Sequence, residues 1–284
     1  MTIHAAIAER AKAGELLTAA ELDALAAADL LSLGMLADEV RRARVGDTVT
    51  FTRVLDLSPG GGVPDVPGVE VRIAKLPDTL DEAEAVVAEA RMLAGTQRLT
   101  GFSLADLVDR HWSDLGTVLA RLKHAGLNAI AECQVDRIAD VSVLKAAQAA
   151  GVPVRVLSLQ KPLTTSHTDY ILTVRAILQA VPSIHAVAPL PREQSIAVPT
   201  TGYDDVRSVA LSRLGLPAAR NIQVDWAQYG PKLAQVALTF GANDLDRVST
   251  DDDASLGRRR TSVEDVKRNI IAAGFTPVEV AAGA

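Results

Sequence analysis

The chain has 284 residues, of which 48% are hydrophobic, 23% charged and 3% aromatic. This length is enough to bury a core without disulfides or metals, and the single cysteine, Cys133, excludes an intrachain disulfide and suits a reducing compartment. The formal net charge of -6 argues against a nucleic-acid-binding protein, because such a protein needs a basic face to replace the counterions of the phosphates.

The sequence carries no signal for a membrane. No stretch approaches the ~20 consecutive apolar residues that a spanning helix requires. The first residues include Glu9, Arg10 and Lys12 and lack the apolar core of a secretory signal. We therefore expect a soluble, cytoplasmic protein that binds neither nucleic acid nor membrane.

Residues 1–46 have the composition of a helical extension. Thr18 precedes Glu21 by three residues, which is the spacing of a capping box and predicts the start of a helix. Asp29 is placed to cap the next helix, and Gly46 is placed to end it.

From residue 48 onward, short runs rich in β-branched residues alternate with amphipathic helical runs. The predicted strands are 48–54, 69–76, 98–103, 128–134, 152–159, 184–190, 221–226 and 243–248. The predicted helices are 79–93, 104–125, 141–150, 165–180, 203–214, 230–240 and 262–273. This alternation is typical of βαβ units, and eight such strands are the number that closes a (β/α) barrel. We predict an α/β fold with a single barrel-like domain over residues 1–284.

One segment breaks the alternation. Residues 56–68 read DLSPGGGVPDVPG, with three prolines, four glycines and no helical periodicity. A step between parallel strands normally contains a helix, so the barrel is expected to be shortened or irregular after its first strand. If that strand pairs differently, the sheet has an open edge, which a partner or a second copy would cover.

The candidate site residues are the polar residues at the expected C-terminal ends of the strands, where barrel enzymes place their active sites. They are Arg53, Lys75, Ser103, Glu132, Gln134, Asp136, Gln160, Lys161, Arg192, Glu193, Asp225, Gln228, Asn243, Asp244 and Asp246. For each, a solvated loop residue is the alternative interpretation.

Glu132, Cys133 and Gln134 form the most informative group. Alternate residues of a strand face the same side, so Glu132 and Gln134 are expected to face inward and Cys133 outward. A buried carboxylate needs a partner, and Lys75 at the end of a neighbouring strand is the candidate. The five histidines lack the spacing of a metal site, and no G-x-S-x-G motif indicates a serine hydrolase.

Three segments together resemble one family. They are ADLLSLGMLADEVRRARVGDTVTF, then LTGFSLADL with LGTVLARLKHAGLNAI, and finally NIQVDWAQYGPKLAQVALTFGANDLDRV with TSVEDVKRNIIAAGFTPVE. They resemble radical S-adenosylmethionine enzymes of menaquinone and deazaflavin biosynthesis: aminofutalosine synthase, dehypoxanthine futalosine cyclase and deazaflavin (FO) synthase. The form GANDLD is nearest to aminofutalosine synthase. The resemblance covers residues 1–54 and about 98–280.

The resemblance implies a (β/α) barrel that carries a [4Fe–4S] cluster on a three-cysteine loop directly after the first strand. Here that place is residues 55–68, which contain no cysteine. The family's glycine-rich turn after the fourth strand corresponds to Glu132–Asp136, and its fifth-strand histidine corresponds to Gln160. The departures fall on the cofactor-binding half, so we predict no cluster and no radical chemistry.

Two functions remain open at this point. The first is a non-catalytic homologue, an accessory or ligand-responsive subunit of futalosine-type menaquinone metabolism, either as a homo-oligomer or in complex with a related radical enzyme. Binding of S-adenosylmethionine or a nucleoside without turnover is its intermediate case. The second is a non-radical lyase, hydrolase or transferase acting on a nucleoside or a small carboxylated metabolite.

The residue roles in the two cases differ. In the enzyme, Glu132, Asp136 and Lys75 are the general acid–base candidates. The predicted ligand-binding residues are Gln134, Gln160, Arg192, Asn243, Asp244 and Asp246. No metal ligand is predicted.

Overall fold

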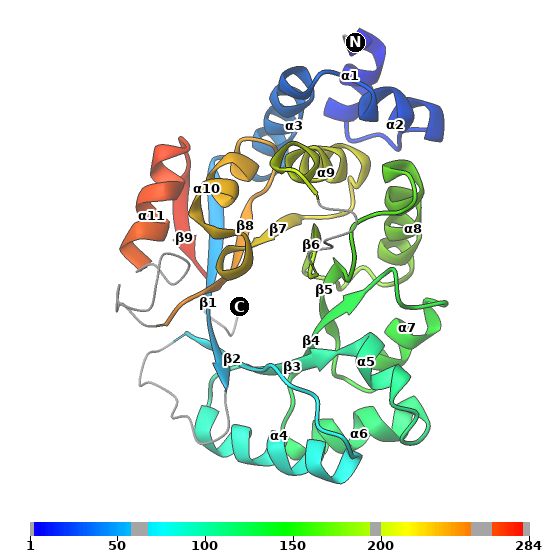
Figure 1. Ribbon diagram of the computed structural model, residues 1–284, viewed down its shortest axis with the longest axis vertical. Helices are drawn as coiled ribbons and strands as arrows, with labels where there is room; N and C mark the ends of the chain where they lie inside the picture. The colour runs from blue at the N-terminus through cyan, green and yellow to red at the C-terminus, as the bar shows by residue number, and fades with distance from the viewer. Residues whose placement is uncertain (1–2, 58–67, 194–199, 251–262, 281–284) are drawn as a thin grey trace.

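The computed structural model describes residues 3–57, 68–193, 200–250 and 263–280. Eight parallel strands form a closed barrel (Figure 1), because β1 pairs with β8 on one side and with β2 on the other. The strands are β1 (Thr48–Leu57), β2 (Glu70–Ile73), β3 (Leu99–Ser103), β4 (Ala129–Gln134), β5 (Val154–Leu159), β6 (Ala186–Pro191), β7 (Asn221–Asp225) and β8 (Asp244–Val248). The predicted α/β barrel is confirmed.

Helices surround the barrel. They are α4 (Leu80–Ala94), α5 (Leu104–Asp109), α6 (Leu115–Ala125), α7 (Ser142–Ala149), α8 (His167–Ala180), α9 (Gly202–Gly215), α10 (Trp226–Leu238) and α11 (Val263–Ala272). The single predicted helix 104–125 is wrong: Asp114 accepts a hydrogen bond from the backbone N–H of Thr117 and starts a new helix. None of the helices in the described ranges has the length and apolar character that crossing a bilayer requires.

The N-terminal extension consists of α1 (Ala5–Lys12), α2 (Ala19–Ala26) and α3 (Leu30–Val45), at the blue end of the chain in Figure 1. The predicted signals are present, since Thr18 and Glu21 form a capping box, Asp29 caps α3 and Gly46 ends it. Helix α2 packs on α8 and α9, α3 packs on α9, and α1 packs on α3.

The first strand is longer than predicted and pairs with three others. Residues Thr48–Phe51 pair with a ninth strand, β9 (Thr276–Glu279), and residues Val54–Leu57 pair with β2 farther along the same side. Because β1 lies between β2 and β8, the predicted open edge is wrong for the barrel itself. The edge belongs to β9, which the sequence did not predict because Pro277 indicated a stop. An edge strand tolerates a proline, which has no N–H to donate.

The apolar core and the barrel interior differ in character. The main cluster of buried apolar side chains lies between the strands and the surrounding helices. A separate small cluster contains only Val156, Ala186 and Ala188. Polar and charged side chains occupy much of the interior, and the Arg72–Asp246 ion pair joins β2 to β8 across it. A buried charge is costly unless it is paired, so these interior charges depend on their partners.

Candidate functional site

A cavity of ≈ 290 Å³ opens among the C-terminal ends of the barrel strands. Its lining is predominantly polar. The polar lining residues are Asp56, Arg72, Ser103, Asp106, Glu132, Gln134, Gln160, Arg192, Asp225, Gln228, Asp246 and Arg247. The cavity lies at the end of the barrel where α/β barrels place their active sites.

Arg72 on β2 pairs with two buried carboxylates, those of Glu70 and Asp246. Its Nη1 lies 2.8 Å from the Asp246 carboxylate of β8, and its Nη2 lies 2.5 Å from that of Glu70. Thr100 donates a further hydrogen bond of 2.7 Å to Glu70. Burial opposes the charge of Asp246, but the Arg72 guanidinium outweighs it and lowers the pKa of that carboxyl to about 2. Asp246 is therefore fixed as an anion at neutral pH.

Arg192 and Arg247 pair with three further carboxylates that line the cavity. The Nε of Arg192 lies 2.7 Å from a carboxylate oxygen of Glu132, and its Nη1 lies 3.3 Å from Asp225. Arg247 pairs with Asp56 and lies 3.7 Å from Asp225. Burial raises the pKa of the Asp225 carboxyl, and the two guanidinium groups offset this only in part. Relative to an ordinary aspartate, the pKa of Asp225 is thus raised and that of Asp246 is lowered.

Three glutamine side chains complete the polar wall. The Gln134 amide oxygen accepts a hydrogen bond from the Ser103 hydroxyl, and its nitrogen donates a hydrogen bond of 3.1 Å to the Glu132 carboxylate. The Gln228 amide donates 2.9 Å to two backbone carbonyls at the end of β6. Gln160 donates 2.6 Å to the carboxylate of Glu193. These hydrogen bonds fix the orientation of each amide, as a preorganised binding site requires.

Two lining residues have strained backbones. Phe102 at the end of β3 has φ = 61° and Arg247 in β8 has φ = 54°, both in the left-handed region that disfavours residues with a Cβ. Such a conformation costs of order 1–3 kcal/mol and tends to occur where side chains are aimed for function. Both residues line this cavity, which supports its identification as the site.

The structure brings together eight of the fifteen candidate residues. The candidates that line the cavity are Ser103, Glu132, Gln134, Gln160, Arg192, Asp225, Gln228 and Asp246. The predicted placement of Glu132 and Gln134 on one face and Cys133 on the other is confirmed, since Cys133 lies in the main apolar cluster.

Two of the predicted acid–base residues lie elsewhere. Lys75 lines a separate groove beside α4, so the predicted pairing of Lys75 with Glu132 is wrong, and Arg192 is the partner. The Asp136 carboxylate accepts hydrogen bonds from the backbone N–H groups of Gln160 (2.8 Å) and Lys161 (3.1 Å). It joins the turn after β4 to the end of β5.

Asn243 and Asp244 lie at the opposite, N-terminal end of the strands. The Asn243 amide oxygen accepts a hydrogen bond of 2.9 Å from the Ile222 N–H. Asp244 accepts from Thr50 (2.5 Å) and Gln223 (2.7 Å) inside the barrel. Burial raises the pKa of the Asp244 carboxyl, and nearby His185 offsets this in part. Neither residue lines the cavity.

Four further polar residues line the cavity but were not among the candidates: Asp56, Arg72, Asp106 and Arg247. A signal was present for one of them. In the segment EVRI of β2, Glu70 and Arg72 alternate with Val71 and Ile73. That alternation predicts a charged face pointing into the barrel and an apolar face pointing outward.

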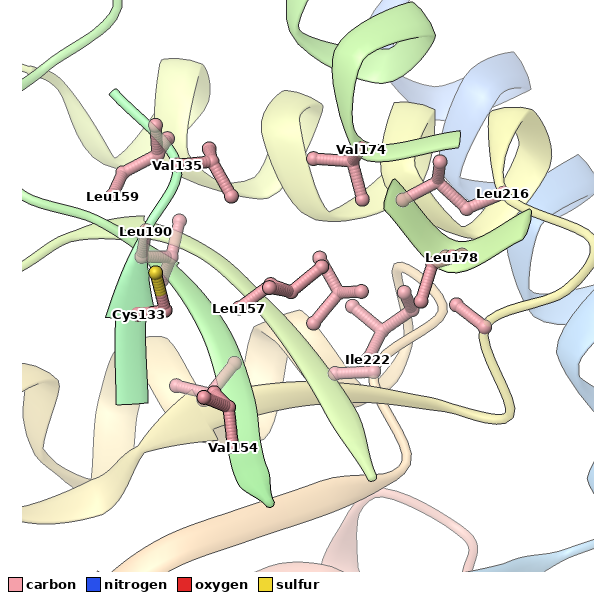
Figure 2. Packing of buried hydrophobic residues seen from close by; sticks show 14 of the residues in the cluster. Cys133, Val135, Val154, Leu157, Leu159, Val174, Leu178, Leu190, Leu216 and Ile222 are labelled. Carbon is pink, nitrogen blue, oxygen red and sulfur yellow. The ribbon is translucent and has the colours of Figure 1, made fainter. Parts of the chain in front are cut away.

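The residues present do not fit an iron–sulfur cluster, which several cysteine thiolates normally hold. Cys133 is the only cysteine of the sequence, and its side chain has no exposure to solvent. It lies in the same apolar cluster as Leu157 and Leu190 (Figure 2), and burial raises the pKa of its thiol to about 12. Of the predicted cluster loop, 55–68, residues 58–67 lie outside the described residues, but their sequence contains no cysteine.

Comparison with known proteins connects the chain to one group. Residues 182–281 match the protein family described as the CofH/MqnC C-terminal region. The 5-amino-6-(D-ribitylamino)uracil–L-tyrosine 4-hydroxyphenyl transferase of Archaeoglobus fulgidus is 32% identical over 133 residues, 44% of this chain and 39% of that protein. Transferase 1 of Methanosarcina barkeri is 30% identical over 198 residues, 57% of this chain and 52% of that protein. The chain spans about half the length, or less, of these relatives.

Solved structures show the same fold. Methylornithine synthase (PylB) superimposes with a TM-score of 0.68 over 96% of this chain and 97% of its own, at 15% identity. The [FeFe]-hydrogenase maturase HydG gives a TM-score of 0.65 over 96% of this chain and 74% of its own, at 12% identity. Identities this low support the fold alone.

Proposed function

We propose that this protein binds a small heterocyclic metabolite bearing a hydroxylated chain or ribose in the barrel cavity, and that it acts without radical chemistry. The observation that carries the proposal is the cavity itself. The cavity is lined by Arg72, which pairs with Asp246, by Arg192, which pairs with Glu132, and by glutamine amides held in place by hydrogen bonds. The only thiol of the chain, that of Cys133, faces away from it.

The lining suits such a ligand for a chemical reason. A pyrimidine or purine edge presents alternating donors and acceptors, and hydroxyl groups both donate and accept. Amides of Gln134 and Gln228 and carboxylates of Glu132 and Asp246 offer both kinds of partner. Two ligand types meet this description: the ribitylaminouracil named for the relatives, and the futalosine-type nucleosides implied by the sequence resemblance.

In the form we favour, the protein is a ligand-binding or accessory subunit that does not transform what it binds. Its partner is a second copy of the chain or a related radical enzyme, and the futalosine route to menaquinone is one setting. The names of the two relatives favour a setting in which aminouracil and tyrosine are handled.

A second function is favoured by the different surroundings of Asp225 and Asp246: burial raises the pKa of Asp225, whereas the ion pair with Arg72 lowers that of Asp246. A pair of carboxyl groups whose environments separate their pKa values is the usual arrangement for acid–base catalysis. In a non-radical lyase, hydrolase or transferase, Asp225 would carry the proton and Asp246 would stay ionised. This replaces Asp136 and Lys75, which lie outside the cavity.

A thermal-shift and calorimetry panel on aerobically purified protein tests the proposal. The panel contains 5-amino-6-(D-ribitylamino)uracil, tyrosine, S-adenosylmethionine, adenosine, aminofutalosine and futalosine. A ligand at a hundred times its dissociation constant stabilises the fold by about 2.7 kcal/mol, which the screen detects. We expect a heterocyclic hit whose affinity falls at least about tenfold in the Glu132→Gln/Arg192→Gln variant.

The matched control is Lys75→Met, which removes a charged side chain outside the cavity and is expected to leave affinity unchanged. A silent panel, or a hit equally weakened by both variants, would count against the proposal. Mass spectrometry of the bound ligand after incubation separates the two functions. Conversion that Asp225→Asn abolishes while binding persists would favour the enzyme, and an unchanged ligand would favour the binding subunit.

A further inference from the structure

The N-terminal end of the barrel, opposite the cavity, carries charges of mostly one sign. Six connections lead from a helix into β3, β4, β5, β6, β7 and β8, and none of them contains an aspartate or a glutamate. They are residues 95–98, 126–128, 150–153, 181–185, 216–220 and 239–243. Arg98, His185 and Arg220 belong to them, while the acidic residue before β1, Asp47, pairs with Arg42. These connections therefore give this end a positive charge, in a chain whose net charge is -6.

Arg155, the second residue of β5, is a half-buried cation without a partner. Among the residues that the structure describes, its guanidinium makes no hydrogen bond and no ion pair. Cations at the end of a helix complement the helix dipole, but Arg155 lies within a strand. A guanidinium carries five N–H donors, and leaving donors unmet in a partly buried place is costly.

Two other groups that can carry positive charge stand beside Arg155. The backbone N–H of His185 donates a hydrogen bond of 2.9 Å to the Arg155 carbonyl, so the two residues are neighbours on adjacent strands. Burial lowers the pKa of the Arg155 guanidinium, and the charge of Arg98 lowers it further. Burial also lowers the pKa of the His185 imidazole, and both arginines add to this effect. The three groups therefore repel one another when charged, and an anion between them would relieve the repulsion.

The carboxylates behind this cluster have closer partners of their own. Glu70, Asp244 and Asp246 offset part of the positive charge that acts on Arg155. Glu70 and Asp246 pair with Arg72 at 2.5 and 2.8 Å. Asp244 accepts hydrogen bonds of 2.5 and 2.7 Å from side chains of β1 and β7. These carboxylates leave the donors of Arg155 unused.

We propose that Arg98, Arg155 and His185 form a binding site for a tetrahedral dianion, either free phosphate or the phosphate group of a small metabolite. The His185 side chain is 28% exposed, so solvent reaches the site from the N-terminal end of the barrel. Guanidinium groups bind phosphate oxygens through pairs of N–H donors, and an imidazolium adds a further charged donor. The positive charge of the surrounding connections attracts an anion to this end. The site is separate from the cavity and does not depend on the ligand proposed there.

Isothermal titration calorimetry at low ionic strength tests the proposal with inorganic phosphate, glycerol 3-phosphate and sulfate. We expect inorganic phosphate to bind with a dissociation constant of about 1 mM or below, and Arg155→Gln to weaken it at least about tenfold. Tighter binding of glycerol 3-phosphate would assign the site to a phosphorylated metabolite, and tighter binding of inorganic phosphate would assign it to the free anion. The matched control is Lys123→Gln, which removes one charge from the same end, because the Lys123 side chain lies over Gly151. This control should leave the affinity nearly unchanged.

The pH dependence of sulfate binding tests the role of His185, because sulfate keeps its charge between about pH 6 and about pH 8 while an ordinary histidine titrates there. A bound dianion favours the imidazolium, so sulfate should raise the pKa of His185 in an NMR titration and bind more tightly at the lower pH. The charged groups that act on His185 are Asp244, which lies 3.9 Å from its Nε2, and Asp246, Arg98 and Arg155. His185→Gln should abolish the pH dependence and leave weaker binding by the two arginines.

Far-UV circular dichroism and thermal melting establish that the variants fold. Without an anion, Arg155→Gln should be at least as stable as the wild type, because it removes a repelling charge; a large loss of stability would indicate a structural role instead. The proposal is overturned if none of the three anions binds, if Arg155→Gln and Lys123→Gln weaken binding alike, or if the pH dependence persists in His185→Gln.

Discussion

Replacing Arg72 with methionine tests whether the charges inside the barrel depend on one another. Glu70 and Asp246 are only 2% and 3% exposed, and Arg72 is the cation that pairs with both. Breaking a buried pair by removing one partner typically costs about 3–5 kcal/mol, because the remaining charge stays buried. The lowering of the Asp246 pKa from 3.8 to about 2 accounts for about 2 kcal/mol of that stability at neutral pH.

The sign of the pH dependence follows from these pKa values. A carboxyl whose folded pKa is lowered stabilises the fold above its unfolded pKa, and this contribution is lost as pH falls toward 2. In Arg72→Met the cation is gone, so burial is expected to raise the pKa of the Asp246 carboxyl instead. The variant should therefore recover stability relative to the wild type as pH falls from about 7 to about 5.

Urea unfolding at both pH values measures the effect. Arg121→Met is the matched control, since Arg121 pairs with Asp81 at 2.6 Å and with Glu84 on the surface. Exposed pairs contribute little, so the control should change the free energy of unfolding far less. Arg72→Met combined with Glu70→Gln and Asp246→Asn should recover most of the loss. Equal losses of unfolding free energy in Arg72→Met and Arg121→Met, or a loss in Arg72→Met that is the same at both pH values, would show that the interior carboxylates do not depend on Arg72.

Two further predictions concern the packing. Cys133 should react with a thiol reagent at pH 8 only as fast as the protein unfolds, because the thiol is buried and its pKa is about 12; rapid labelling of the native protein would contradict its placement. Gly34→Ala should cost about 1–3 kcal/mol in urea unfolding, because a Cβ there would lie 2.6 Å from the Phe240 ring. Gly202→Ala, where a Cβ meets nothing within 4 Å, should be close to neutral, and a similar loss in both variants would argue against that contact.

The strands were predictable because eight β-branched runs alternate with helical ones, and all eight are present. The sequence could not predict β9, because a proline in a final segment indicates an end unless the segment lies at an edge. Nor could it show that the 104–125 run divides, since the break near residue 111 depends on the left-handed conformation of His111. Local patterns identify elements, while tertiary contacts decide where they end.

The site was predictable only in part. Glu132, Gln134 and Arg192 stand near strand ends and converge on the cavity, as barrel geometry requires. Lys75 misses it because β2 ends at Ile73, so that Lys75 already belongs to the turn toward α4. Asp244 misses it because it stands at the start of β8, as it does in the predicted strand 243–248, and so lies at the N-terminal end of the barrel. The predicted boundary was nearly right here, and the error was to take a residue at the start of the strand as a site residue.

This chain is predicted to hold no iron–sulfur cluster, in contrast to the radical enzymes it resembles. Anaerobic reconstitution of the purified protein with iron and sulfide, followed by desalting and iron determination, tests it most directly. We expect no retained iron and no absorbance of the kind a [4Fe–4S] cluster gives, because Cys133 is the one thiol and it is buried in the apolar layer. About four irons per chain that survive desalting, with cluster absorbance that bleaches on reduction, would contradict it.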